Sequence, residues 1–327
     1  MINVYMESKG KLVSKKTDNE GTLPAIKPSM WISITAPNAN LLKKVAKKTK
    51  INLPFLLTSL DSEESARIDK SGDDSLIVLD VPCEKDLDSK TKSNFRKSFT
   101  TIPFLIIYNS SYIVTISKKD TGLVDAFLQK TKVCEPHKHV RTTLLFLYAL
   151  AQEFISYLKK IDAESKDVEA KLHSSMKNKE LFDLMALNKM LVYFSTALSA
   201  DKAVLERLMK TPDFKQFSDD YDLMEDVQVE LNQAIEMCNI YRDILSGMMD
   251  AFASIISNNL NIVMKILAIV TIVLSVPTLV ASFYGMNVKD IPLADNNNAF
   301  YVILAISAGL SLIAAVILFF IERRHRH

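Results

Sequence analysis

Two apolar stretches near the C-terminus constrain the fold of this 327-residue chain more than any other feature. Residues 262–283 are apolar apart from Lys265 and several hydroxyl residues, and residues 299–321 carry no charge. A helix needs about 20 apolar residues to cross the hydrocarbon core of a bilayer, and each stretch is long enough. The chain is therefore expected to be a membrane protein with two transmembrane helices.

The charges around these stretches predict their orientation. The tail, 322–327, contains three arginines, whereas the connection 284–298 is net acidic. Because basic residues favour the cytoplasmic side, both termini are expected in the cytoplasm and the connection outside the cell (inner or plasma) membrane. The first residues lack the apolar core and the small-residue cleavage site of a signal peptide, in keeping with a cytoplasmic N-terminal part.

A region nearly free of glycine and proline precedes the first apolar stretch. From His139 onward, apolar positions recur at three-and-four spacing, which predicts helices at about 140–174, 178–210 and 222–283. The third would be roughly 90 Å long, at 1.5 Å per residue. Its apolar seam from Val227 to Ile262 resembles that of a coiled coil, so we interpret residues 136–261 as a stalk that packs against copies of itself.

The N-terminal part, residues 1–135, alternates β-rich runs with helical patterns and is expected to form an α/β domain. Together with the helices and the transmembrane hairpin of residues 262–327, this predicts an α+β membrane protein. The formal net charge is only +2, which gives no indication of a nucleic-acid partner. The expected strands are 30–35, 75–81, 102–108 and 112–116, and the expected helices lie near 38–48, 53–61 and 122–130.

One face of the first apolar stretch carries small or hydroxyl side chains at three-and-four spacing. Small residues permit close packing of helices, and hydroxyl groups can also line a water-filled pore; the sequence leaves both interpretations open. The residues of this face are Asn261, Met264, Ala268, Thr271, Ser275, Thr278 and Ser282.

A short motif, Tyr284-Gly285-Met286-Asn287, follows this stretch and is preceded by Pro277-Thr278-Leu279-Val280-Ala281-Ser282. With two C-terminal apolar stretches and a basic tail, it resembles the CorA family of magnesium channels. The resemblance implies a funnel-shaped homopentamer whose outer selectivity site is formed by Gly285, Met286 and Asn287. It also implies a pore wall of Asn261, Met264, Leu267, Thr271, Ser275, Thr278 and Ser282, so that Leu267 and Ala268 remain alternatives.

Neutral oxygens suit a hydrated magnesium ion, which gives up its water reluctantly. Five Asn287 amides would accept hydrogen bonds from that water, and neither apolar stretch contains Asp or Glu. Asp290 and Asp295 would raise the local cation concentration, and Met264 with Leu267 would form an apolar constriction. The sequence contains no nucleotide-binding motif; the membrane potential would drive entry, and no cofactor is expected besides Mg²⁺ as transported and regulatory ion.

Family members also sense cytoplasmic magnesium at carboxylates between neighbouring subunits, and the resemblance implies Asp226 on the stalk side. Where the family tends to carry an acidic pair in the N-terminal domain, this chain has Thr58-Ser59, with Asp61 slightly further on. We therefore treat Asp226 and Asp61 as the candidate ligands of a regulatory ion.

Other interpretations remain open. The chain could be a membrane-anchored coiled-coil scaffold, or it could transport Co²⁺, Ni²⁺ or Zn²⁺. The group Cys134, His137 and His139 resembles half of a transition-metal site but has no second half, which favours a linker. We find no nucleophile–base pair or phosphate-binding loop, so the sequence does not indicate an enzyme.

Overall fold

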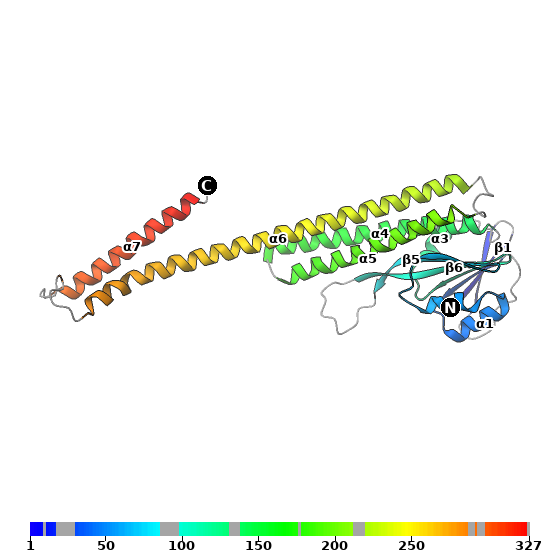
Figure 1. Ribbon diagram of the computed structural model, residues 1–327, viewed down its shortest axis with the longest axis horizontal. Helices are drawn as coiled ribbons and strands as arrows, with labels where there is room; N and C mark the ends of the chain where they lie inside the picture. The colour runs from blue at the N-terminus through cyan, green and yellow to red at the C-terminus, as the bar shows by residue number, and fades with distance from the viewer. Residues whose placement is uncertain are drawn as a thin grey trace. The chain divides into compact units, whose positions relative to one another are not determined.

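The computed structural model describes residues 1–8, 11–17, 30–85, 98–130, 138–175, 178–211, 220–286, 292 and 298–325. Contacts within the chain separate two compact units, residues 1–249 and residues 250–327. One continuous helix, α6 (Tyr221–Tyr284), runs through the boundary between them (Figure 1). The two units are therefore joined by one continuous helix.

A seven-stranded sheet forms the centre of the first unit, in the order β2-β1-β3-β7-β6-β5-β4. β3 pairs with β7 in parallel, and the other neighbouring strands pair antiparallel. The four strands expected from the sequence lie within β3, β5, β6 and β7, whereas β1, β2 and β4 were not predicted. The strands are β1 (Ile2–Ser8), β2 (Lys11–Thr17), β3 (Met30–Thr35), β4 (Arg67–Ser71), β5 (Asp74–Lys85), β6 (Ser98–Tyr108) and β7 (Tyr112–Ser117).

Short helices cover one face of the sheet. They are α1 (Ala39–Thr49), α2 (Leu53–Leu57) and the 3₁₀ turn η1 (Thr58–Leu60). Asn38 begins α1 as predicted, because its side chain accepts a hydrogen bond from the backbone N–H of Leu41 at 2.8 Å. Leu42 and Val45 are buried against the strands, so the opposite side of α1 faces outward.

The helices α3 (Leu123–Lys130), α4 (His139–Ser175) and α5 (Asn178–Leu208) lie on the other face of the sheet. An aromatic cluster joins them to the strands. Phe146 of α4 stacks on Phe127 of α3, with 4.1 Å between the ring centroids, and its ring lies edge-to-face with that of Trp31 of β3, with 5.7 Å between centroids. Trp31 also donates a hydrogen bond from its indole nitrogen to Thr115 Oγ1. Burial of these large rings fixes α4 on the sheet.

The first part of α6 packs on α4 and α5. Val227, Leu231, Ala234 and Cys238 are buried, and the Cys238 thiol lies 3.3 Å from the Leu191 carbonyl of α5. The expectation that copies of the chain cover this seam is wrong for its first half, because α4 and α5 of the same chain cover it. Three-and-four spacing predicts that a face is covered but does not specify by which helix.

The three long helices agree closely with the ranges expected from the sequence. The second unit consists of the remainder of α6 and of α7 (Ala299–His325), which turns back alongside it (Figure 1). Among the described residues, α5, α6 and α7 are long and apolar enough to cross a membrane. α5 contributes Leu184, Leu191 and Leu198 to the core of the first unit, whereas the apolar parts of α6 and α7 are largely uncovered.

Candidate functional site

In the second unit, α6 has two faces with different surroundings. Its least exposed residues recur at three-and-four spacing and match a row of less exposed residues on α7, so these rows form the contact of the hairpin. On α6 they are Ile269, Val273, Val276, Val280 and Tyr284, and on α7 they are Ile303, Ser307, Ser311, Ala314 and Leu318. We call the hydroxyl residues of α6 the hydroxyl row; they are Thr271, Ser275, Thr278 and Ser282. Because a helix turns about 100° per residue, this row lies about 180° away from the contact.

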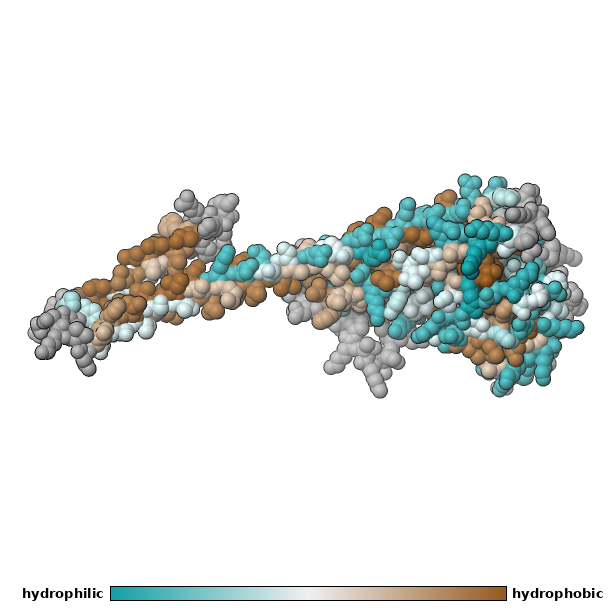
Figure 2. Space-filling model, in the orientation of Figure 1, coloured by the Kyte–Doolittle hydropathy of each residue, from teal (hydrophilic) through white to brown (hydrophobic). Residues whose placement is uncertain are grey.

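The hydroxyl row is therefore the face that the hairpin leaves open, and apolar side chains dominate the rest of the unit's surface (Figure 2). Thr271 donates its hydroxyl hydrogen to the Leu267 carbonyl at 2.8 Å, and Thr278 donates to the Leu274 carbonyl at 3.2 Å. Ser275 donates to the Ile272 carbonyl at 2.8 Å. With these hydrogens bound to the helix, each oxygen keeps lone pairs that can accept from water outside it.

All candidate pore residues of α6 lie on its uncovered surface. Leu267 and Ala268 are both exposed, so their alternative stays open. The complete set is Asn261, Met264, Leu267, Ala268, Thr271, Ser275, Thr278 and Ser282.

The predicted selectivity motif lies at the end of this helix. The N–H of Gly285 donates to the Ala281 carbonyl at 2.9 Å, and that of Met286 donates to the Phe283 carbonyl at 3.3 Å, so both continue the last turn. A methyl group on Gly285 would lie 3.3 Å from the Ala281 oxygen, which leaves little room for another residue. Asn287, Asp290 and Asp295 lie outside the described residues.

Asp61 and Asp226, the candidate regulatory ligands, lie on opposite sides of the first unit. Asp61 follows η1 on the α1 side of the sheet, and its side chain accepts from the Glu63 N–H at 2.9 Å. Asp226 is exposed near the start of α6, beyond α4 and α5. Among the described residues, no group of three or more acids, histidines or cysteines is placed to hold a metal ion. One copy of the chain thus does not bring these carboxylates together.

The candidate transition-metal group is only partly visible. Cys134 and His137 lie outside the described residues. His139 begins α4, and its ring stacks on Tyr108 of β6 at 4.9 Å. This contact connects α4 to the sheet.

A contact between two acids of α5 and β5, one of them fully buried, was not predicted. Asp201 is fully buried and accepts a hydrogen bond from the backbone N–H of Asp80 at 2.9 Å. Burial, and then the charge of Asp80, raises the pKa of Asp201 well above its usual value. Burial also raises the pKa of Asp80 to about 6. The sequence did contain a signal, because Asp201 occupies an apolar row of α5 with Phe194, Leu198, Leu205 and Leu208.

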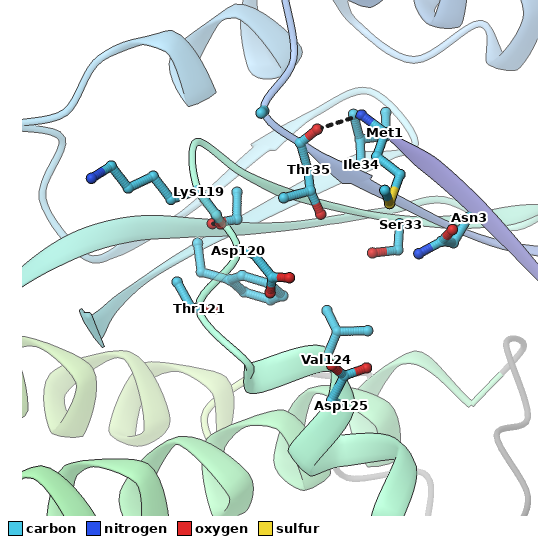
Figure 3. Close-up of a pocket in the computed structure, with 13 residues that line it drawn as sticks. Met1, Asn3, Ser33, Ile34, Thr35, Lys119, Asp120, Thr121, Val124 and Asp125 are labelled. Atoms are coloured by element: carbon cyan, nitrogen blue, oxygen red, sulfur yellow. Dashed lines mark hydrogen bonds between the residues drawn. The ribbon is translucent and has the colours of Figure 1, made fainter. Parts of the chain in front are cut away.

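A pocket of about 350 Å³ opens where the parallel strands β3 and β7 end, beside the start of α3 (Figure 3). Ser33 and Phe104 belong to its lining, with Asp120 and Asp125 on the α3 side. The carboxyl ends of parallel strands are a common place for ligands. Both carboxylates are exposed, whereas Ser33 is buried.

Comparison with known proteins identifies the family. The family model described as "CorA-like Mg2+ transporter protein" matches residues 27–324. The chain belongs to the CorA family. The match includes strands β3 to β7, the three long helices and nearly all of α7.

Individual CorA proteins resemble the chain over much of its length. The cobalt/magnesium transport protein CorA of Methanocaldococcus jannaschii is 26% identical over 289 residues, which cover 87% of this chain and 88% of the relative. That of Thermotoga maritima is 26% identical over 168 residues, 51% of this chain and 48% of the relative. The structure of the M. jannaschii CorA magnesium transporter matches with a TM-score of 0.75 at 23% identity, covering 99% and 98% of the two chains. This CorA protein thus has the expected α+β membrane fold.

Proposed function

We propose that this CorA protein is one subunit of a homopentameric channel that admits hydrated Mg²⁺ to the cytoplasm. The observation that carries the proposal is the hydroxyl row of α6, which lies on the face turned away from α7. A membrane anchor has no need of four hydroxyl oxygens on one uncovered face. A pore wall needs them, because the water around a cation donates hydrogen bonds.

Self-association supplies the enclosed path that one hairpin lacks. With the hydroxyl rows of several copies turned toward a common axis, apolar side chains of α6 and α7 remain for lipid. Such closed rings of identical subunits are common among oligomers. The number five comes from the family resemblance.

Selectivity is proposed to reside at Gly285, Met286 and Asn287. A ring of neutral amide oxygens from Asn287 would hold the hydration shell of Mg²⁺ without binding the ion so tightly that release becomes slow. Moving a divalent ion through 100 mV is worth about 4.6 kcal/mol, so inward flow requires no ATP. The proposed topology has two transmembrane spans and both termini in the cytoplasm, the compartment that the ion enters.

Regulation by cytoplasmic Mg²⁺ is proposed to involve Asp226. Its exposed carboxylate would share the ion with groups of a neighbouring subunit and favour the closed state. The test is Mg²⁺ uptake by proteoliposomes with increasing internal Mg²⁺. Asp226→Ala should remove the inhibition, and unchanged inhibition would rule out this role.

The pore proposal is tested by removing one hydroxyl from each face of the hairpin. Thr278→Val keeps the shape of the side chain but loses its oxygen, and we expect Mg²⁺ uptake to fall by about threefold to tenfold, the effect of a lost hydrogen bond. Ser311→Ala on the α7 contact is the matched control and should leave uptake unchanged. Equal effects of both variants would contradict a pore on the Thr278 side.

Asn287→Ala distinguishes a channel from a membrane-anchored scaffold. A channel should lose Mg²⁺ uptake and selectivity, whereas a scaffold would show no uptake with or without the substitution. Uptake of Mg²⁺ by the same vesicles in the presence of external Co²⁺, Ni²⁺ or Zn²⁺ as competitors identifies the preferred cation.

A further inference from the structure

The first unit carries two charged surfaces of opposite sign. From residue 36 to residue 60 the chain contains five lysines and no acid, and from residue 216 to residue 241 it contains seven acids and no lysine or arginine. The first segment includes α1 and the second the start of α6. Such a separation creates two local fields although the net charge is only +2.

The basic surface is the outer side of α1. Lys43, Lys44, Lys47 and Lys48 are exposed, while Leu42, Val45 and Thr49 on the opposite side of the same helix are buried. No acidic side chain lies within α1 itself. The helix therefore presents an entirely basic face, which we call the lysine face.

The acidic surface is the outer side of the first turns of α6. Asp222, Glu225 and Asp226 are exposed, and the buried residue Val227 points to the opposite side, toward α4 and α5. Exposed apolar residues continue this side of the helix, with Val229 at 60% and Ile240 at 55% exposure. An acidic border beside uncovered apolar side chains is typical of a surface that another protein covers. We call it the acidic face.

Not every acid of this region is available to a partner. Asp220 forms an ion pair with Arg141 of α4 at 3.0 Å, and the side chain of Gln152 of α4 lies 3.5 Å from Glu230. These contacts hold the start of α6 in place. They leave Asp222 and Glu225 on the outer side as the carboxylates best placed for a contact with another molecule.

The two faces lie on opposite sides of the unit. α1 covers one face of the sheet, α4 and α5 cover the other, and α6 lies beyond α4 and α5 (Figure 1). One copy therefore cannot bring its own lysine face to its own acidic face. Two different, complementary surfaces on opposite sides produce head-to-tail contacts, which close into a ring when the rotation between copies allows it.

We propose that the lysine face of α1 binds the acidic face of α6 in a second copy of this chain. Lys43 and Lys47, one helical turn apart, pair with Asp222 and Glu225 of the neighbour. The contact goes beyond the proposed channel, on which it rests only in requiring more than one copy. It sets the order of subunits through ion pairs that salt weakens, so association declines as ionic strength rises.

Zero-length crosslinking tests the contact directly. The full-length protein is co-assembled from normal and heavy-isotope chains and treated with a carbodiimide, which joins amines to carboxylates without a spacer. We expect crosslinks between residues 39–50 and 220–230 that combine one normal and one heavy peptide. Crosslinks confined to peptides of the same isotope, or the absence of crosslinks between these segments, would overturn the proposal.

Charge reversal with rescue supplies the second measurement. Lys43→Glu with Lys47→Glu should raise the concentration for half-dissociation in detergent by about fivefold to tenfold, as should Asp222→Lys with Glu225→Lys. Combining all four should restore association. Lys70→Glu with Lys85→Glu, two exposed lysines of β4 and β5, is the control and should have no effect.

Other outcomes separate this proposal from that of the channel. If reversal of the lysines leaves assembly unchanged but weakens binding to anionic vesicles, the lysine face contacts lipid headgroups and the proposal is wrong. A rescued oligomer that does not conduct Mg²⁺ supports the contact and contradicts the channel. A protein that conducts Mg²⁺, and whose assembly is unchanged by every charge reversal, supports the channel and contradicts the contact.

Discussion

The two units of the chain bury their apolar side chains in different ways. In residues 1–249, the sheet and its helices bury most of the large apolar residues, and α4 and α5 cover the first half of the seam of α6. In residues 250–327, large side chains such as Leu274, Phe283, Leu312 and Phe320 are all at least 61% exposed. The first unit therefore derives its stability from contacts within the chain, whereas the second leaves its apolar side chains for lipid or other molecules to cover.

The largest test of this difference removes one phenylalanine from each unit. Phe146 is fully buried, and we expect Phe146→Ala to lower the free energy of unfolding by about 3–5 kcal/mol because it leaves a cavity. Phe319 is 60% exposed, and Phe319→Ala should change the free energy of unfolding by less than about 0.5 kcal/mol. Trp31, the single tryptophan, touches Phe146 and reports unfolding of the first unit by fluorescence.

Equal losses from the two substitutions would break the comparison. They would mean that the apolar helices stabilise the first unit as much as its own core does. The denaturation must be performed in detergent on the full chain, so that both variants start from the same assembly.

The next test concerns the contact between two acids in the first unit. Because the pKa of Asp80 is raised from 3.8 to about 6 in the folded chain, the unfolded chain loses this proton first as pH increases. The stability contributed by protonated Asp80 is complete below about pH 4 and is lost as pH rises through 6. Asp80→Asn should therefore be more stable than the parent at pH 7.5, by about 2–3 kcal/mol.

The pH dependence separates charge from packing. At about pH 4 both folded proteins carry a neutral side chain, so the difference in unfolding midpoint should disappear. The amide oxygen can still accept the hydrogen bond that Ala66 donates to Asp80. A difference that is the same at both pH values would show that burial does not hold Asp80 protonated.

Sequence patterns predicted the long helices well, because absent glycine and proline and a regular apolar spacing act locally along the chain. They missed β4, whose five residues are mostly polar and lie at an edge of the sheet. They also missed the Asp80–Asp201 contact, because its partners are 121 residues apart. The sequence showed the hydroxyl row as a periodic face, but only the structure of the hairpin shows that this face lies opposite α7.

The helices that cover the apolar seam of α6 could not be predicted from the sequence either. Val227 and Leu231 had the spacing of a coiled coil, and that spacing is equally satisfied by a partner in the same chain or in another copy. Only the fold shows that α4 and α5 are this partner. The sequence therefore predicted which residues are buried better than what buries them.

The smallest test asks whether the outer side of α6 is as open as one copy suggests. Gly247 is exposed, and a methyl group there would meet no atom within 4 Å. In a single copy, Gly247→Ala should raise the free energy of unfolding by about 0.5–1 kcal/mol, because alanine restricts the unfolded chain and favours helix. If thermal unfolding of the assembled protein shows a loss instead, another copy approaches the backbone at this position. That result would place a contact between copies within the first unit.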